Sequence, residues 1–591
     1  MIKILMKQIG QYKRDTILTP VFTGLEVLLE ILIPFITAKI IDEGIEAGNM
    51  TRVYQYGLLM LVMAALSLVC GYLAGAFAAR ASSGFACNLR DSMYESIQTY
   101  SFSNIDKFST AGLVTRMTTD VTNLQNAFQM IIRIAVRSPL MLIVSMVMCL
   151  VINARLSLIF VAAILVLGCI LFFIMTRTTK IFDQVFSKYD DLNASIQENV
   201  TAIRVVKAFV REDYENEKFT RAAQNLYRLF VKAEKILTYN NPAMMLVVYG
   251  CILALSWFGA RFVTAGSLTT GELTSMFSYV MSILMSLMML SMIFVMVTMS
   301  GASARRIVQV LTEKPDLANP AKPVMEIPDG RIDFNHVSFS YKSAQTDLTQ
   351  ERKYALQDID LHIRSGETIG IIGGTGCGKS SLVNLVSRLY DVDQGSVCVS
   401  GRNVKEYDME TLRNQVAVVL QKNVLFSGTI LENLRWGNEN ATEEECREAC
   451  IQACADEFVS QFPDGYNTYI EQGGTNVSGG QKQRLCIARA LLKKPKVLIL
   501  DDSTSAVDTA TDASIRAAFA KSIPGTTKLI IAQRISSVEG ADRILVLDEG
   551  RISGFGTHEE LLETNEIYRD IYETQMNAGG DFDHQTAERR A

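Results

Sequence analysis

The chain has 591 residues, which is too long for a single hydrophobic core, so we expect two or more domains. Its formal net charge of -5 gives no reason to expect a nucleic-acid partner. The eleven cysteines are scattered without the spacing of a disulfide framework, which favours a reducing compartment for the soluble part. Apolar residues crowd the first half of the chain, and charged residues crowd the second.

The N-terminal stretch, MIKILMKQIGQYKRD, is too short and too interrupted for a secretory signal peptide. We interpret it as a basic amphipathic segment that lies on a membrane surface. After it come six apolar segments long enough to cross a bilayer, which takes about 20 residues. Their expected bounds are 18–41, 54–79, 131–153, 156–176, 242–264 and 272–299.

Two long polar stretches separate the second apolar segment from the third and the fourth from the fifth. They carry many basic residues, among them Arg90, Arg116 and Lys207, whereas the short loops carry far fewer. The positive-inside rule therefore places both stretches and both termini in the cytoplasm.

The composition changes after the sixth apolar segment. We expect a transmembrane domain over 1–315, a proline-rich linker over 316–330 and a second domain over 331–576, followed by a disordered polar tail over 577–591. In the second domain, short β-rich runs alternate with helical ones. The strand candidates are RIDFNHVSFSY, LHIRSGETIGIIG, QVAVVLQ, KVLILDD, KLIIAQ and RILVLDEG. This alternation predicts an α/β fold with a mostly parallel sheet wrapped by helices.

The run GGTGCGKS matches the pattern of a phosphate-binding loop, and it stands between a predicted strand and a predicted helix, as this loop requires. Glycines let the backbone N–H groups wrap a polyphosphate, Lys379 supplies a positive charge, and Ser380 can coordinate Mg²⁺. The expected nucleotide-binding residues of this loop are Gly373, Gly374, Thr375, Gly376, Cys377, Gly378, Lys379, Ser380 and Ser381.

A second nucleotide motif follows about 120 residues later, where the run KVLILDD predicts a buried strand that ends in carboxylates. Asp501 is the expected Mg²⁺ ligand. A buried strand with a capping aspartate is the alternative interpretation, but it does not explain why both motifs occur together.

These motifs and the run NVSGGQKQR resemble the ATP-binding cassette (ABC) family, whose signature motif is usually written LSGGQ. The run SAVD resembles the D-loop of this family. The six apolar segments with two long cytoplasmic stretches resemble the transmembrane part of drug- and lipid-exporting ABC proteins. The resemblance implies further roles: Tyr341 stacks on adenine, Gln421 acts as the Q-loop residue and Mg²⁺ ligand, and the remaining contacts to ATP come from Ser478, Gly479, Gly480, Gln481 and Asp508.

The resemblance implies a half-transporter that works as a dimer, with each ATP held between the phosphate-binding loop of one chain and the signature motif of the other. Two positions depart from the family pattern. The family usually has a glutamate as general base where this chain has Asp502, and a switch histidine where it has Gln533. A displacement of about 1 Å at a reacting group costs on the order of 100-fold in rate. Glutamine also lacks the positive charge of a protonated histidine.

Both departures lie in the half-site built from this chain's own loop, so we expect that site to bind ATP and Mg²⁺ but to hydrolyse ATP poorly. This pattern resembles heterodimeric exporters, and it predicts a non-identical partner chain with Glu and His at these positions. A slow homodimer, and a regulatory or channel-like membrane protein gated by ATP, are the alternatives. The resemblance favours a bacterial plasma membrane, with drugs, lipids or hydrophobic peptides as substrates and lipids as neighbours.

Three groups of residues leave alternatives open. The last apolar segment carries a methionine stripe that either packs between helices or lines a substrate cavity, with Met285, Met288 and Met292 as cavity candidates. Glu26 and Glu30 lie at membrane depth, where they either pair with Arg133 or Arg137 or attract a cationic substrate. The repeat of Cys446, Cys450 and Cys454 favours a packed helix face over a metal site.

Overall fold

The computed structural model of the protein describes residues 1–341, 354–501 and 509–576. The chain forms two compact units. The helical unit comprises Met1–Gln98 and Thr110–Glu313, and the α/β unit comprises Thr99–Ser109 and the chain from Lys314 onward. The sequence grouped Thr99–Ser109 with the transmembrane part, whereas the structure packs it with the α/β unit.

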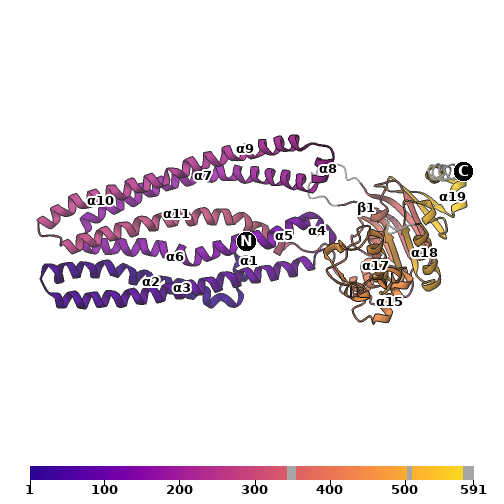
Figure 1. The fold of residues 1–591 in the computed structure, drawn as a ribbon, viewed down its shortest axis with the longest axis horizontal. Coiled ribbons are helices and arrows are strands. Elements are labelled where there is room, and N and C mark those ends of the chain that lie inside the picture. The colour runs from indigo at the N-terminus through magenta and orange to yellow at the C-terminus, as the bar shows by residue number, and fades with distance from the viewer. Residues whose placement is uncertain (342–353, 502–508, 577–591) are drawn as a thin grey trace. The chain divides into compact units, whose positions relative to one another are not determined.

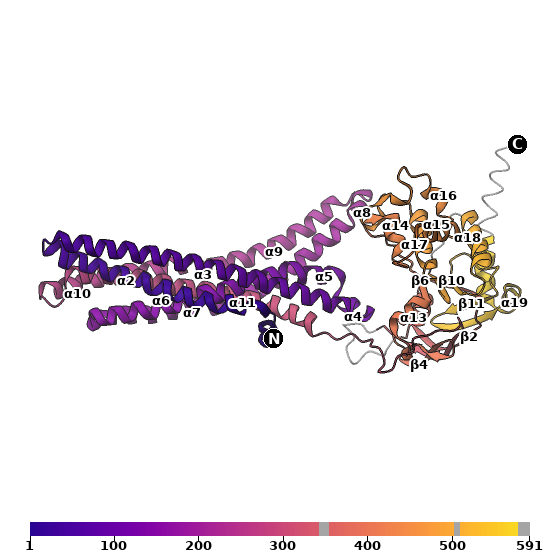
Figure 2. The same cartoon turned by 90° about the horizontal axis from the view of Figure 1, so that it is seen from below.

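The helical unit is a bundle of long helices (Figure 1). They are α2 (Lys13–Lys39), α3 (Met50–Gln98), α6 (Val121–Ile152), α7 (Ala154–Thr201), α9 (Glu212–Thr238), α10 (Asn240–Thr264) and α11 (Thr270–Thr312). Shorter elements complete it: α1 (Ile2–Lys7), η1 (Gly10–Tyr12), η2 (Ile40–Glu46), α5 (Thr110–Thr115), η3 (Arg116–Asp120) and α8 (Ile203–Ala208). α2 packs on α3 and α6, α11 packs on α6, and α7 packs on α9 and α10 (Figure 2).

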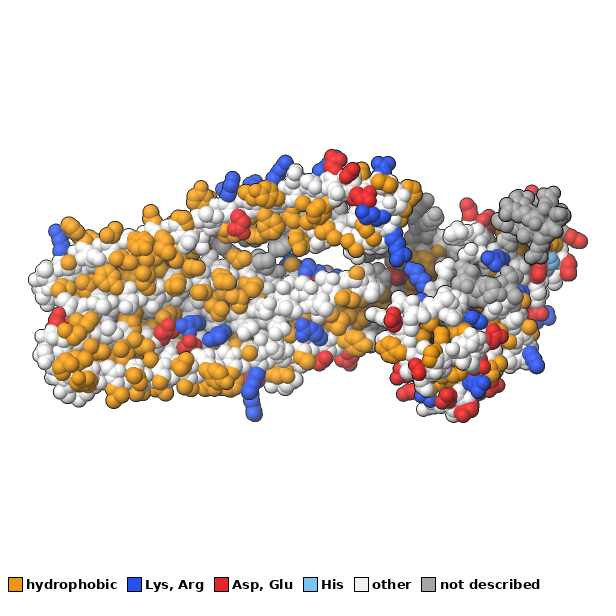
Figure 3. Space-filling model, viewed as in Figure 1, with side chains coloured by type: hydrophobic (Ala, Val, Ile, Leu, Met, Phe, Trp, Pro, Cys, Tyr) orange, Lys and Arg blue, Asp and Glu red, His pale blue; other side chains and the backbone are white. Residues whose placement is uncertain are grey.

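Within the described residues, six helical stretches are long and apolar enough to cross a membrane, as the sequence predicted. Five predicted apolar segments lie inside one of these stretches, and the predicted segment 131–153 runs one residue past the stretch Thr110–Ile152. Most of the stretches extend beyond the predicted bounds at one end or both. Large apolar side chains such as Leu68, which is 74% exposed, cover the outside of the bundle (Figure 3). Such a surface is stable only where lipid or protein covers it, so the bundle is the membrane-spanning part of the chain.

The core of the α/β unit is a sheet with the strand order β12-β11-β3-β10-β9-β6 among the described residues. Its strands are β3 (Thr368–Gly373), β6 (Val416–Val419), β9 (Val497–Asp501), β10 (Thr527–Ile531), β11 (Arg543–Asp548) and β12 (Arg551–Gly556). All neighbouring pairs in it are parallel except β11 with β12. The predicted parallel sheet is therefore present. Its strands β3, β6, β9, β10 and β11 are largely buried, whereas the edge strand β12 is mostly exposed or half-buried.

A second sheet, which the sequence did not predict, is antiparallel and has the order β2-β1-β4-β5 in the described chain. Its strands are β1 (Ile332–Phe339), β2 (Leu356–Ile363), β4 (Gln394–Val399) and β5 (Arg402–Asn403). A short pair joins β7 (Gly428–Thr429) to β8 (Tyr469–Ile470). The predicted strand LHIRSGETIGIIG is in fact two strands, because the turn at Gly366 (φ +82°) sends β2 and β3 into different sheets.

The helices of the α/β unit surround these sheets. They include α12 (Lys379–Val386), α13 (Met409–Gln415), α14 (Ile430–Arg435), α15 (Glu443–Gln452), α16 (Asp456–Val459), α17 (Gly479–Leu491), α18 (Thr509–Ser522) and α19 (His558–Thr564). The helix α4 (Phe102–Phe108) also belongs to this unit, although it lies in the first half of the sequence.

Candidate nucleotide-binding site

The glycine-rich loop connects the end of β3 to the start of α12. Gly376 and Gly378 adopt φ values of +83° and +101°, a region that residues with a side chain rarely occupy. A Cβ atom at Gly378 would lie only 2.6 Å from the carbonyl oxygen of Ala355. The glycines at these two positions are therefore required by the backbone path of the loop.

Lys379 and Ser380 are the first two residues of α12 and face different partners. The Lys379 ammonium donates hydrogen bonds to the carbonyl oxygens of Gly373 and Gly374, each at 2.8 Å, so it is folded back over the loop. The Ser380 hydroxyl donates to Oδ1 of Asp501 at 3.0 Å. Asp501 is the last residue of β9 and is buried. Strand β9 and helix α12 thus bring together two of the three predicted oxygen ligands for Mg²⁺, and the third, Gln421, lines the cavity described next.

A cavity of about 980 Å³, here called the nucleotide cavity, opens over this loop. Its lining includes most of the residues predicted to bind nucleotide: Tyr341, Gly373, Gly374, Thr375, Gly376, Gly378, Lys379, Ser380, Ser381, Gln421, Asp501 and Gln533. It also includes residues that sequence reasoning missed, among them Tyr354, Glu549 and Ile571. No local motif marks these three residues, and Glu549 and Ile571 reach the cavity from segments far along the chain.

Tyr341 stands at one wall of the nucleotide cavity. Its hydroxyl forms a hydrogen bond with the Ser381 hydroxyl at 2.9 Å. Its ring meets those of Phe339 and Tyr390 edge to face, with centroid distances of 4.8 and 5.2 Å. These contacts hold the ring in place and leave the side chain 47% exposed, so a face remains available for an aromatic base.

Gln533 follows β10 and is tied to the C-terminal end of the described chain. Its carbonyl oxygen accepts a hydrogen bond from the Gln575 amide at 2.9 Å, and Gln575 Oε1 accepts from the N–H of Ile535 at 2.9 Å. The Gln575 side chain therefore holds the backbone from the Gln533 carbonyl to Ile535, directly after the residue that lines the nucleotide cavity.

The remaining predicted nucleotide residues lie elsewhere. Cys377 is buried and, in the described chain, is not part of the cavity lining. Asp502 and Asp508 lie outside the described residues. The signature residues Ser478, Gly479, Gly480 and Gln481 stand at the start of α17 and contribute nothing to this cavity within the described ranges.

The start of α17 is capped by its own side chains. The Ser478 hydroxyl accepts a hydrogen bond from the N–H of Gln481 at 3.3 Å, and Gln481 Oε1 accepts from the N–H of Ser478 at 2.9 Å. This reciprocal arrangement is a capping box. The Ser478 hydroxyl hydrogen is not used in it and can be donated to an anion.

The residues of the nucleotide cavity fit ATP and Mg²⁺. The loop offers backbone N–H groups at a helix start, and Lys379 offers an ammonium that can donate to phosphate oxygens. Ser380 and Asp501 offer the oxygen ligands that Mg²⁺ prefers. When bound, ATP supplies the phosphoanhydride that such a site can cleave.

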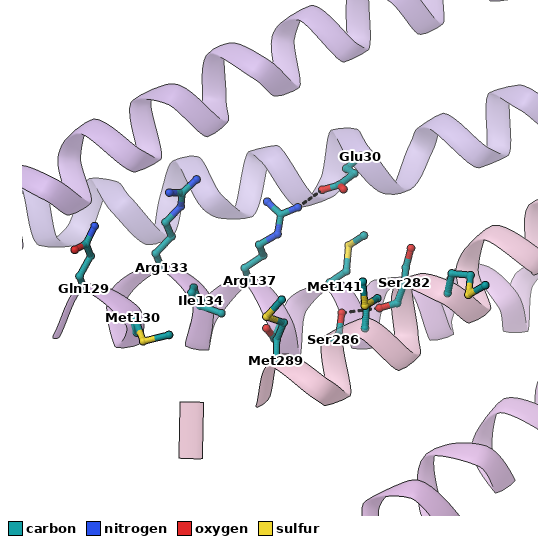
Figure 4. A pocket seen from close by; sticks show the side chains of 13 residues that line it. Glu30, Gln129, Met130, Arg133, Ile134, Arg137, Met141, Ser282, Ser286 and Met289 are labelled. Carbon is teal, nitrogen blue, oxygen red and sulfur yellow. Dashed lines mark hydrogen bonds and ion pairs between the residues drawn. The ribbon is translucent and has the colours of Figure 1, made fainter. Parts of the chain in front are cut away.

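A second cavity, of about 590 Å³, lies inside the helical unit between α2, α6 and α11, and is here called the membrane cavity (Figure 4). Of the predicted cavity residues, Glu30 and Met285 line it, whereas Glu26, Met288 and Met292 do not. Met281 and Met289 line it with Met285 at four-residue spacing. The methionine stripe of the sequence therefore divides between this cavity and other surfaces.

The two membrane glutamates pair with an arginine, as one of the two sequence interpretations predicted. Arg137 Nη2 bonds Glu30 Oε2 at 2.6 Å, and Arg137 Nη1 bonds Glu26 Oε1. The arginine lies on α6, and both glutamates lie one turn apart on α2.

The cysteine repeat packs as the sequence favoured. Cys446 and Cys450 are fully buried in the apolar core around α15, and Cys454 packs against the same core. Burial raises the pKa of the Cys450 thiol to about 12.

Comparisons with known proteins agree with this architecture. Residues 16–303 match the family described as ABC transporter transmembrane region, and residues 356–505 match the family described as ABC transporter. YfiB of Bacillus subtilis, an uncharacterized ABC transporter ATP-binding protein, is 36% identical over 94% of this chain and 95% of its own length. The ATP-dependent lipid A-core flippase of Hahella chejuensis is 31% identical over 87% of this chain and 86% of its own.

A solved structure has the same fold. A bacterial Atm1-family ABC exporter with ATP bound matches with a TM-score of 0.79 and 23% identity, over 96% of this chain and 98% of that one. The family matches cover one transmembrane region and one ATP-binding cassette in a single chain. The chain therefore belongs to the ABC transporter family and is a half-transporter with the exporter fold.

Proposed function

We propose that this chain is one subunit of an ATP-driven exporter that moves amphipathic or hydrophobic compounds across a membrane, and that its own nucleotide site binds ATP and Mg²⁺ but hydrolyses ATP slowly. The observation that carries the proposal is the position of Gln533, which lines the nucleotide cavity together with Lys379 and Asp501. A glutamine there can donate a hydrogen bond but cannot take up a proton.

The slow hydrolysis follows from two residues together. Asp502 directly follows the metal-binding Asp501, and its carboxylate is one methylene shorter than the glutamate expected of a general base. Proton removal from the attacking water depends on the placement of that carboxylate to within about 1 Å. Gln533 offers no positive charge to the outer phosphate, so neither departure compensates for the other.

The signature motif supports a second chain, and the departures at Asp502 and Gln533 favour a non-identical one. Ser478 and the glycines after it start α17 away from this chain's nucleotide cavity, so they are available to the nucleotide of another chain. A partner with Glu and His at the two altered positions would complete one rapid site from its own loop and this chain's signature motif. The other site, built from Lys379 and Asp501, would hold ATP for longer.

The compounds transported are proposed to enter the membrane cavity, which offers methionine side chains that adapt to varied apolar shapes. One relative carries the name of a lipid A-core flippase, which makes lipids one of the substrate classes to test. Several relatives come from bacteria, and a bacterial plasma membrane is the proposed location.

The test compares ATP binding and turnover by the purified chain. We expect wild-type protein to bind ATP with Mg²⁺ and to turn it over slowly, and Lys379→Ala to lose binding. The double variant Asp502→Glu, Gln533→His should raise turnover on the order of 100-fold, because it restores the expected base and switch residue. Each single variant should recover less than the double variant.

Brisk turnover by the wild-type chain alone, abolished by Asp502→Asn, would overturn the proposed division of labour in favour of a homodimer. Transport into inverted vesicles tests the exporter itself. Accumulation of a substrate above its outside concentration supports pumping, whereas equilibration without accumulation would identify an ATP-gated pore.

A further inference from the structure

The charged side chains of the membrane cavity do not form two simple pairs. Arg137 bonds both Glu26 and Glu30, so a single guanidinium satisfies two carboxylates. The second arginine, Arg133, lies one turn away on the same face of α6 and also lines the cavity. In Figure 4 both arginines project to the same side of this helix, but only Arg137 reaches a glutamate.

Arg133 has no hydrogen-bond or ion-pair partner anywhere in the described chain. Its guanidinium rests beside Gly75 of α3, where a Cβ atom would lie 3.4 Å from Nη1. Oε2 of Glu26 is buried and also lacks a hydrogen-bond partner among the described residues. The structure thus leaves these two groups apart.

An unpaired guanidinium at membrane depth is costly, and such groups usually face a water-filled cavity or bind a ligand. Arg133 faces the cavity on its polar side, next to Gln129, one helical turn away on α6. Guanidinium groups bind carboxylates and phosphates through paired N–H donors, and Gln129 adds another donor. This end of the cavity therefore has the composition of an anion subsite.

The rest of the cavity is suited to an apolar body. Met281, Met285 and Met289 line it from α11, and Met130 and Ile134 line it from α6. Ser282 and Ser286 add little polarity, because Ser286 already donates its hydroxyl hydrogen to the Ser282 carbonyl at 2.7 Å. The anion subsite and this apolar wall belong to one continuous cavity.

We propose that Arg133 binds the anionic group of an amphipathic substrate, a phosphate or carboxylate, while the methionine wall receives its apolar chain. This inference rests on the proposed export function and assigns its substrate class. A cationic group is disfavoured at this place, because Arg137 already engages both carboxylates that would attract it. Arg133 and Gln129 then recognise the anion by donating hydrogen bonds to it.

The test measures equilibrium binding of dodecyl phosphate to the purified chain in neutral phosphatidylcholine nanodiscs. Dodecyl trimethylammonium, dodecyl maltoside and inorganic phosphate serve as comparison probes. We expect dodecyl phosphate to bind most tightly, and Arg133→Gln to weaken it by about tenfold or more, since a charge-assisted hydrogen bond is lost. Arg133→Lys should retain part of the affinity, and binding of the maltoside should not change.

Arg261→Gln is the matched control, because Arg261 lies on α10 and packs over Trp257, away from the cavity lining. It should bind dodecyl phosphate as wild type does. Equal weakening of all amphipathic probes by Arg133→Gln, with a lowered Tm, would overturn the proposal and make Arg133 a structural counter-charge. Tight binding of inorganic phosphate alone would also overturn it, because the apolar chain would then contribute nothing.

Transport in vesicles separates this inference from the proposed function. Failure to transport any probe would refute export, whatever the binding result. Transport of all probes with a selectivity that Arg133→Gln leaves unchanged would refute only the anion subsite.

Discussion

At the scale of single residues, the cysteines around α15 show how burial controls reactivity. Cys446 and Cys450 are fully enclosed, and loss of hydration raises the pKa of Cys450 to about 12. The reactive thiolate forms only as the pH approaches the pKa, so Cys450 stays a neutral thiol at physiological pH and into mildly alkaline solution. Its side chain therefore acts as a small apolar group in the core.

This predicts that iodoacetamide leaves Cys450 unmodified in the folded protein from pH 7 to about pH 9. Cys87, which is exposed, should be alkylated under the same conditions. Mass spectrometry of peptides reports both sites in one sample. Alkylation of Cys450 as fast as Cys87 before unfolding would contradict the burial of this helix face.

Single residues also mark the limit of sequence reasoning. The motif residues around Lys379 were predictable because a short pattern encodes a backbone shape and a chemistry together. The pairing of the membrane glutamates was predictable as a type, since an unpaired charge in the membrane is costly. The choice between Arg133 and Arg137 was not, because it depends on how α6 is rotated against α2, and the sequence does not fix that rotation.

At the scale of elements, two helices with the same cap allow stability and function to be separated. Thr442 caps α15 through a capping box with Glu445, and Ser478 caps α17 through one with Gln481. Loss of either cap costs about 1 kcal/mol, because one helix-terminal N–H loses its acceptor. The proposed function gives only Ser478 a second task, toward a nucleotide on another chain.

We therefore expect Ser478→Ala and Thr442→Ala to lower thermal stability by similar amounts. Only Ser478→Ala should reduce the ATPase rate of the assembled complex. Differential scanning measurements and ATPase assays on the same preparations check both statements. An equal loss of ATPase activity in both variants would mean that Ser478 affects the ATPase rate only through the stability of the protein.

Elements were predicted unevenly. The strands of the parallel sheet were recognisable, because strands such as β9 and β10 are buried on both faces and read as continuous apolar runs. Strand β1 was recognised as a strand but its partners were not, since alternation along one strand says nothing about which strand lies beside it. β4 was missed because it begins with the polar run Gln-Gly-Ser, and β5 was missed because it has only two residues.

At the scale of the whole molecule, α4 links an early part of the sequence to the cassette. Asp106 accepts a hydrogen bond from the Tyr390 hydroxyl at 2.8 Å, and Phe102 packs against the same ring. Asn104 is buried and donates to the carbonyl oxygen of Lys314 at 3.2 Å. Burial, reinforced by the bond to Asp106, raises the pKa of Tyr390, so this hydroxyl remains a donor at physiological pH.

Tyr390→Phe removes the hydrogen bond between the cassette and Asp106 of α4. We expect this variant to move less substrate per ATP hydrolysed and to retain ATP binding. Tyr407→Phe is the control, since Tyr407 is buried in the cassette and its hydroxyl donates to the Val399 carbonyl oxygen at 2.9 Å. It should cost about 1 kcal/mol of stability and leave the transport ratio unchanged. An unchanged ratio in Tyr390→Phe would show that its bond to Asp106 carries no coupling.

The placement of α4 has a consequence for biosynthesis. Asn104 and Lys314 are 210 positions apart, and Asp106 and Tyr390 are 284 positions apart. During translation, the contacts of α4 can therefore form only after the later spans and the first cassette strands have been synthesised. Until then Phe108, which is buried in the folded unit, is exposed to chaperones and proteases. The folding of the α/β unit is thus completed by a helix that is synthesised well before the rest of that unit.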